Sequence, residues 1–238
     1  MNIHNQTKTI FLKFCYFSLA MLLFSCKADT PKKEKQSEIN NNNSIEIEKT
    51  EKNTTKKIIF FGDSLTAGYG LDDVENAFPG IIQRTIDSLQ LNYTVVNSGV
   101  SGETSSGGKN RIDWVLNEKP AVFVLELGAN DGLRGVPLVA TKKNLQFIID
   151  AVKTKYPTTK IVLAGMQIPP NMGQAYAAEF KSIFPDLAQK NEIVLVPFLL
   201  ENVGGISDLN QADGIHPTKK GHAILAKNVW SVLAPLLN

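Results

Sequence analysis

The chain has 238 residues, of which 43% are hydrophobic and 20% are charged, and its net charge is +2. This composition excludes a fully disordered, collagen-like or disulfide-scaffold protein, and it fits one globular domain with appendages. Residues 1–57 hold 10 Lys/Arg against 6 Asp/Glu, whereas residues 58–238 hold 15 against 17. The larger part is therefore slightly acidic and its basic residues are scattered, so we expect no nucleic-acid partner.

The first segment, residues 1–26, has the features of an export signal. It begins with Lys8 and Lys13 and continues with the apolar run Phe14–Phe24. That run is shorter than the about 20 residues that a transmembrane helix needs. We therefore predict a signal peptide that is removed, and no membrane helix in the mature chain.

Cys26 directly follows Leu23-Phe24-Ser25. This arrangement resembles the lipobox of bacterial lipoproteins, which implies cleavage before Cys26 and attachment of lipid to it. The protein would then be exported and held by lipid at a membrane of the cell envelope, facing the periplasm or the surface. The alternative is ordinary cleavage after Ala28, giving a soluble periplasmic or secreted protein. Because Cys15 is lost with the leader, no disulfide is expected within the mature chain.

Residues 27–57 are predicted to be a disordered, charged tether. They include the run Asn40–Asn43, and their few apolar residues cannot offset the entropy of ordering the segment. A coil of this length would hold the following domain roughly 30 Å from its anchor.

From residue 58 to residue 238, short apolar runs alternate with longer helical patterns. This alternation is typical of a parallel sheet covered on both faces, so the predicted fold is a three-layer α/β domain. The predicted strands are Ile58–Gly62, Tyr93–Asn97, Ala121–Gly128, Lys160–Met166 and Ile193–Phe198. Helical spacing of apolar residues predicts helices over residues 78–89, 138–152, 176–187 and 224–233, with a weaker pattern over Gly107–Asn117.

Ligands of such sheets bind outside the carboxyl ends of the strands, so chemically active residues are sought there. Ser64 follows the first predicted strand, where it can present its hydroxyl or merely cap a helix. Gly102 lies in a glycine-rich loop after the second strand, where backbone N–H groups can point at an anion. Asn130 follows the third strand, where its amide can donate to an oxyanion or tie a turn.

The loop after the last predicted strand contains Asp213 and His216. With two residues between them, the carboxylate can accept from the imidazole Nδ1–H and leave Nε2 free as a base. His222 enters the last helix, and we interpret it as structural. Asp63 and Asp131 occupy turn positions, which favours helix capping or supporting hydrogen bonds over direct catalysis.

Together these segments supply a nucleophile, a base, its orienting acid and oxyanion donors. At this point the sequence resembles the SGNH or GDSL hydrolase family. The blocks, in chain order, are Gly62-Asp63-Ser64-Leu65, Gly102, Gly128-x-Asn130-Asp131 and Asp213-x-x-His216. The stretches Leu127–Arg134, Met166–Pro169 and Asp213–Pro217 also resemble the branch that contains periplasmic acyl-CoA thioesterases, lysophospholipases and arylesterases.

The resemblance implies a flavodoxin-like fold with five parallel strands in the order 2-1-3-4-5. It also implies an ester or thioester hydrolase in which Ser64, His216 and Asp213 form the catalytic triad. The oxyanion would be held by the backbone N–H groups of Ser64 and Gly102 and by the Asn130 side chain. The alternatives are a carbohydrate O-deacetylase on the same fold and a noncatalytic binding lipoprotein of the envelope.

We expect a small-molecule acyl ester or thioester as substrate, no cofactor, and a monomer. A metal site is not expected, because two histidines and scattered carboxylates have no recognisable ligand spacing. An apolar acyl groove is predicted from residues on loops or helix starts after the third and fourth strands. These are Leu133, Val136, Ile168, Pro169, Pro170, Met172 and Tyr176, which could equally be ordinary packing under a loop.

Overall fold

The computed structural model describes residues 54–237. The predicted signal peptide, Cys26 and residues 27–53 of the predicted tether lie outside the described residues. Lys56 and Lys57 already belong to the first strand, so the tether prediction is wrong at its last two residues. No helix in the described part of the chain is long and apolar enough to cross a membrane.

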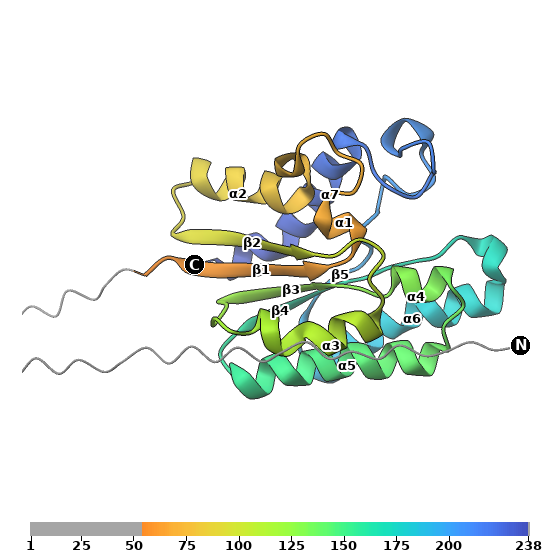
Figure 1. Ribbon diagram of the computed structural model, residues 1–238, viewed down its shortest axis with the longest axis horizontal. Helices are drawn as coiled ribbons and strands as arrows, with labels where there is room; N and C mark the ends of the chain where they lie inside the picture. Colours follow the sequence, from red (N-terminus) through yellow and green to blue (C-terminus); the bar gives the residue numbers. More distant parts are fainter. Residues whose placement is uncertain (1–53, 238) are drawn as a thin grey trace, which may run out of the picture. The chain divides into compact units, whose positions relative to one another are not determined.

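Five parallel strands form one sheet in the order β2-β1-β3-β4-β5, which confirms the predicted fold class (Figure 1). The strands are β1 (Lys56–Gly62), β2 (Tyr93–Gly99), β3 (Val122–Glu126), β4 (Lys160–Ala164) and β5 (Val194–Val196). The α-helices are α1 (Ser64–Ala67), α2 (Phe78–Ser88), α3 (Ser105–Val115), α4 (Ala129–Leu133), α5 (Leu138–Lys155), α6 (Gln174–Asn191) and α7 (Lys219–Leu233). Short 3₁₀ turns are η1 (Val74–Asn76), η2 (Pro170–Met172), η3 (Ser207–Leu209) and η4 (Ala234–Leu236).

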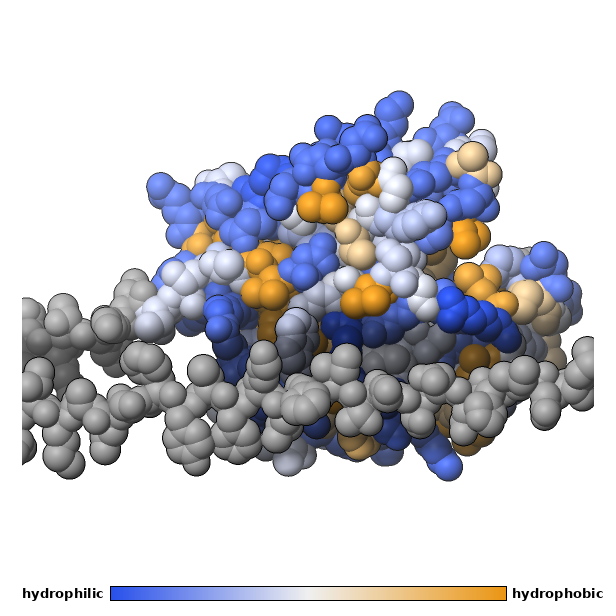
Figure 2. Space-filling view, viewed as in Figure 1, coloured by the Kyte–Doolittle hydropathy of each residue, from blue (hydrophilic) through white to orange (hydrophobic). Residues whose placement is uncertain are grey.

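The sheet is the middle of three layers. Helices α2 and α7 cover one face, and α3, α5 and α6 cover the other (Figure 1). Strand β1 is apolar without alternation because it is buried on both sides. Phe60 packs edge-on against Phe78 of α2 with ring centroids 5.5 Å apart, whereas Phe61 faces the other layer, where the Arg111 guanidinium of α3 lies 4.1 Å from its ring centroid. On the surface seen in Figure 2, apolar residues are scattered among polar ones.

Two predicted boundaries moved for identifiable reasons. Helix α3 begins at Ser105, earlier than the expected residue 107, because the Thr104 hydroxyl accepts from the backbone N–H of Gly107 and caps the helix. Strand β3 ends at Glu126, before the expected residue 128, because Gly128 has a φ of +116° and turns the chain into α4. Helix α4 was not predicted, since five residues are too few to show a helical period.

Candidate active site

The four sequence segments singled out above meet at the carboxyl edge of the sheet. Ser64 begins α1 directly after β1, Gly102 lies in the loop after β2, and Asn130 lies in the first turn of α4 after β3. Asp213 and His216 lie in the loop between η3 and α7. The parallel order of the strands brings these residues together although the first and last are 152 positions apart.

Ser64, His216 and Asp213 form one continuous chain of hydrogen bonds. The Ser64 Oγ lies 2.9 Å from His216 Nε2, and His216 Nδ1 lies 2.6 Å from Asp213 Oδ2. Asp213 Oδ1 accepts from the backbone N–H groups of Ile215 and His216, each at 3.0 Å. The hydrogen bond from His216, together with these backbone donors, lowers the pKa of Asp213 to about 2. The carboxylate is therefore ionised at neutral pH, which assigns the imidazole proton to Nδ1 and leaves Nε2 as an acceptor for the serine hydroxyl.

The turn that carries Ser64 is held by its neighbour. Asp63 is the N-cap of α1, and its Oδ1 accepts from the backbone N–H of Leu65 at 3.0 Å. Ser64 is thus the first helical residue and not the cap, so its own N–H has no acceptor within the helix. Ser64 is 8% exposed and lines a cavity.

The Asn130 amide is fixed at both ends. Its Nδ2 donates to Asp63 Oδ2 at 3.0 Å, and its Oδ1 accepts from Arg134 Nη2 at 3.3 Å. The same Arg134 nitrogen donates to the carbonyl of Gly102 at 3.0 Å. Because Nδ2 carries two hydrogens, one remains after the bond to Asp63. In the described part of the chain, the backbone N–H groups of Ser64 and Gly102 have no protein acceptor.

A cavity of about 620 Å³ opens beside these groups. Its polar wall contains Ser64, Gly102, Asn130 and His216. The rest is mostly apolar and is contributed by Leu65, Leu133, Met166, Ile168, Pro169, Phe198, Leu200 and Ile215. A cavity of this size, with few polar groups gathered at one side, is typical of a site for a small molecule with an apolar portion.

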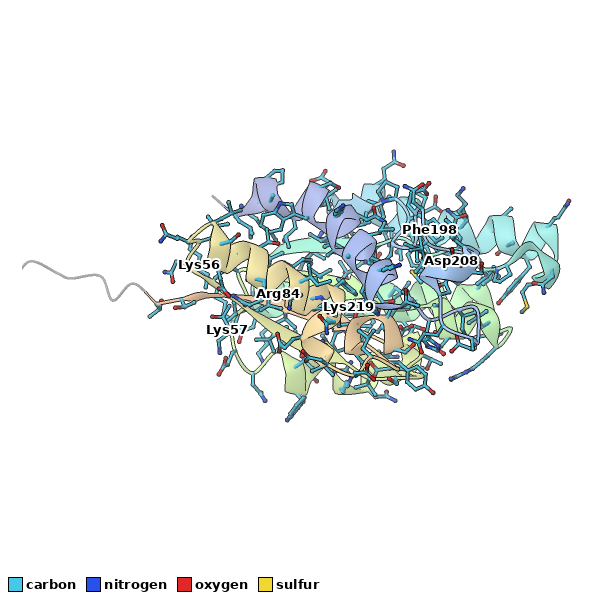
Figure 3. The ribbon with its side chains drawn as sticks, turned by 90° about the horizontal axis from the view of Figure 1, so that it is seen from above. Lys56, Lys57, Arg84, Phe198, Asp208 and Lys219 are labelled. Atoms are coloured by element: carbon cyan, nitrogen blue, oxygen red, sulfur yellow. The ribbon has the colours of Figure 1, made fainter. Side chains whose placement is uncertain are left out.

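The cavity is remote from the end of the sheet at which the described chain begins. Figure 3 shows Lys56 and Lys57, at the start of β1, on the left of the view, whereas Phe198, which lines the cavity, lies right of its centre.

Comparison with known proteins identifies the family. Residues 60–224 match the GDSL-like Lipase/Acylhydrolase family. The chain belongs to this family. It is 39% identical over 189 residues to the Esterase TesA of Pseudomonas aeruginosa, a match that covers 79% of this chain and 92% of that protein.

Two further relatives agree with this family. The Thioesterase 1/protease 1/lysophospholipase L1 of Escherichia coli strain K12 is 34% identical over 182 residues, which cover 76% of this chain and 85% of that protein. The solved structure of the esterase EstA from Pseudoalteromonas sp., inhibited by monoethylphosphonate, superposes with a TM-score of 0.72 at 33% identity, covering 77% of this chain and 99% of that one. As a GDSL-family acylhydrolase, the chain is an enzyme that hydrolyses esters or thioesters.

The structure brings only part of the predicted acyl groove to this cavity. Of its seven residues, the structure places Leu133, Ile168 and Pro169 in the wall of the cavity described here. Met172 and Tyr176 are not among the described residues of that wall. The Tyr176 hydroxyl lies within hydrogen-bond distance of the carbonyls of Gly132 and Val136, at 3.3 and 3.2 Å, so the ring ties α6 to the segment after α4. Val136 is likewise absent from the described wall, and the side chain of Pro170 lies outside the description.

Two polar residues near the site have supporting roles, as expected. Asp131 is buried, and its carboxylate accepts from the backbone N–H and the hydroxyl of Ser105 at 2.7 and 2.6 Å, which fixes the start of α3. His222 is 1% exposed, and its Nδ1 accepts from the backbone N–H of Phe78 at 3.2 Å. Among residues 54–237, no group of three or more His, Cys, Asp or Glu is placed to hold a metal ion.

Sequence reasoning missed several residues at this edge. Phe198 and Leu200 belong to the wall, and the Tyr69 ring lies 4.6 Å from the His216 ring between centroids. Glu126 was missed as well, although a charged residue inside the otherwise apolar run of β3 is itself a signal. The wall residues carried no comparable signal, because apolar residues after a strand are found in most α/β proteins.

Proposed function

We propose that this GDSL-family enzyme is a serine hydrolase that cleaves acyl esters or thioesters through an acyl-enzyme on Ser64. The observation that carries the proposal is the hydrogen-bonded chain from Ser64 to His216 to Asp213 at the wall of an apolar cavity. A serine hydroxyl becomes a strong nucleophile only when a base within hydrogen-bond reach takes its proton, and the 2.9 Å contact provides that base.

In the first half of the reaction, Ser64 Oγ attacks the substrate carbonyl carbon while His216 Nε2 takes the hydroxyl proton. Asp213 accepts the Nδ1–H bond and stabilises the imidazolium that forms. When the tetrahedral intermediate collapses, His216 returns the proton to the departing alcohol or thiol. In the second half, a water molecule gives its proton to His216 and attacks the acyl carbonyl, which releases the acid and restores the Ser64 hydroxyl.

The oxyanion would be bound by the backbone N–H groups of Ser64 and Gly102 and by the remaining Asn130 Nδ2–H. Two features support this assignment: all three residues line the cavity, and neither backbone N–H has an acceptor in the described part of the chain. Donors that are already oriented before the reaction stabilise developing charge without reorganisation. Asp63 and Arg134 supply that orientation for the amide.

The apolar wall favours substrates with an acyl chain over acetyl esters. Every buried methylene contributes about 0.8 kcal/mol, so an apolar cavity selects for chain length. Esters and thioesters of medium acyl chains, including lysophospholipids, are therefore the proposed substrates. Acetate esters of carbohydrates present one methyl group as their acyl chain, so the acyl part would leave most of the apolar wall unfilled.

The test is hydrolysis of p-nitrophenyl esters from acetyl to palmitoyl by the purified protein and its Ser64→Ala variant. We expect activity that rises with chain length and that is lost with Ser64. A fluorophosphonate probe should label the wild-type protein and not the Ser64→Ala variant; labelling that persists would place the nucleophile elsewhere. A folded protein that hydrolyses only acetyl esters would favour a carbohydrate deacetylase, and one inactive on every ester would favour a noncatalytic binding protein.

We also propose that the protein is exported and anchored through lipid on Cys26, with hydrolysis taking place in the cell envelope. The support is the leader and the lipobox-like sequence before Cys26. Mass spectrometry of detergent-extracted protein should find a lipid-sized increment on an N-terminal Cys26. An unmodified chain that begins after Ala28 would contradict the anchor and favour a soluble exported enzyme.

A further inference from the structure

Glu126 is a buried carboxyl group beneath the active site that the proposed reaction does not use. It ends β3, is 0% exposed, and pairs in register with Gly62 at the end of β1. The glycine is needed there, because a Cβ on Gly62 would lie 2.4 Å from Glu126 Oε2 and 2.1 Å from Thr66 Oγ1. Because Gly62 has no side chain, the Glu126 carboxyl group fits beneath the turn that carries Ser64.

The two oxygens of Glu126 have different surroundings. Oε2 accepts from the Asp63 backbone N–H at 3.1 Å and from the Thr66 hydroxyl at 2.7 Å, so it holds the turn on both sides of Ser64. Oε1 is equally buried and has no hydrogen-bond partner in the described part of the chain. A buried carboxylate oxygen without a donor is strongly unfavourable, whereas a protonated oxygen can itself donate.

The charges around Glu126 favour the protonated form. The Asp63 carboxyl group faces it from the start of α1, and burial together with this neighbour raises the pKa of Glu126. Burial also raises the pKa of Asp63, to about 6, although Asp63 receives hydrogen bonds from Leu65 and Asn130.

No ion pair joins Glu126 to a cation among the described residues. Arg111 of α3 reaches the Gly62 carbonyl at 3.5 Å but is engaged by Glu103. The charge of His216 acts on Asp63, where it lowers the pKa of that carboxyl group. One proton on Glu126 therefore lets Asp63 remain ionised at neutral pH.

We propose that Glu126 is a positioning residue: as a neutral acid it donates to the Asp63 carboxylate, which holds the Asn130 amide toward the oxyanion. The two links are the interaction between the Glu126 and Asp63 side chains, which lie together because the Asp63 backbone N–H donates to Glu126 Oε2 at 3.1 Å, and the bond from Asn130 Nδ2 to Asp63 Oδ2 at 3.0 Å. If Glu126 were ionised, two adjacent buried anions would repel each other and the acceptor for Asn130 would move. This inference rests on the proposed function, because it requires Asn130 to stabilise the oxyanion.

The experiment compares Glu126→Gln with Glu126→Ala in the purified enzyme. Glutamine is permanently neutral; its oxygen can accept from Asp63 and Thr66, and its amide can donate to the Asp63 carboxylate. We expect Glu126→Gln to keep kcat within about threefold of wild type. Glu126→Ala should lower kcat by about 10- to 100-fold with KM within about twofold, which is the usual effect of misplacing a catalytic group. The matched control is Glu118→Gln, which makes the same substitution at a surface residue. Glu118 pairs with Lys57, and its substitution should leave kcat unchanged.

Combining each Glu126 substitution with Asn130→Ala distinguishes a positioning role that acts through Asn130 from a merely structural role. If Glu126 acts through Asn130, then Glu126→Ala should lower kcat by less than about threefold further in that background, whereas independent effects multiply. Multiplicative effects overturn the proposal, as does a folded Glu126→Gln enzyme that is as impaired as Glu126→Ala. If the single variant Asn130→Ala keeps the full wild-type kcat, both the assignment of Asn130 to the oxyanion and the positioning role of Glu126 are rejected.

An infrared measurement tests the protonation state without relying on activity, and it also serves if Glu126→Ala fails to fold. The wild-type protein at neutral pH should show a carboxylic-acid band that is absent from Glu126→Gln, and absence of the band from wild type overturns the proposal. If wild type shows Ser64-dependent hydrolysis but the kinetic effects multiply or the infrared band is absent, the proposed function stands and only the role of Glu126 is rejected.

Discussion

The buried His222 should make the stability of this enzyme depend on pH in a predictable way. Its Nδ1 accepts from the backbone N–H of Phe78 at 3.2 Å, and its ring stacks on the Phe78 ring with centroids 6.3 Å apart. Burial, with a smaller contribution from the charge of His216, lowers the pKa of His222 from 6.5 to about 4. The folded state therefore binds this proton less readily than the unfolded state.

The sign and size follow from proton linkage. Stability contributed by the neutral His222 is complete above about pH 6.5 and is lost as the pH falls toward about 4, because only the unfolded chain takes up the proton in that range. At about 1.4 kcal/mol per pKa unit, the wild-type free energy of unfolding should fall by about 2 to 3 kcal/mol between about pH 7 and about pH 4.5 through this one group.

The perturbation is His222→Asn, whose Oδ1 can still accept from Phe78 but does not titrate. Urea unfolding followed by the fluorescence of Trp114 and Trp230 gives the free energy of unfolding at each pH. Asp63 and Glu126 also titrate, yet they are common to both proteins and cancel in the difference. His222→Asn should be less stable than wild type at neutral pH, because it loses ring packing, and this deficit should shrink by about 2 to 3 kcal/mol at about pH 4.5.

A matched control is His216→Asn, which removes the other histidine of the described chain and should retain the acid-dependent loss. If the stability difference between wild type and His222→Asn stays constant within about 0.5 kcal/mol across this range, the buried neutral state of His222 is refuted. A loss that disappears in His216→Asn would assign the titration to the active site instead.

Three other outcomes are expected from the same structure. Asn130→Ala should lower kcat by about 10²- to 10³-fold with little change in KM, and wild-type kcat in the folded variant would exclude Asn130 as an oxyanion donor. Gly62→Ala should unfold at a markedly lower temperature, because its Cβ would overlap the side-chain oxygens of Thr66 and Glu126. An unchanged melting curve would contradict the close approach of these two side chains to Gly62. Gly204→Leu should narrow the cavity, since a side chain there meets Phe198 and Leu200. It should lower kcat/KM for long acyl esters roughly tenfold relative to the acetyl ester, as expected for displacing about two methylenes, and an equal loss on every ester would place the acyl chain elsewhere.

Much of this architecture is encoded locally. Strand β1 could be predicted because Ile58–Phe61 is an uninterrupted apolar run, and α2 because its apolar residues recur on one face. Ser64, Asn130 and His216 could be singled out because each follows a strand, and parallel strands bring their carboxyl ends to one edge. The boundaries were less predictable, since they depend on single caps such as Thr104 and on short turns such as α4.

The tertiary structure alone decided which side chains touch. The sequence predicted Tyr176 as a groove residue and Phe198 as the end of a strand, yet Phe198 lines the cavity and Tyr176 is not among its described lining residues, because the path of each loop depends on what it packs against. Likewise, no local pattern shows that Glu126 accepts from the backbone of Asp63, 63 positions earlier in the chain. The residue order determined the fold and the chemistry available at its edge, because both depend on local periodicity and strand ends. The hydrogen-bond partners and the cavity wall were determined only by the packing of segments far apart in the chain, because hydrogen bonding and close packing act over a few ångströms in space.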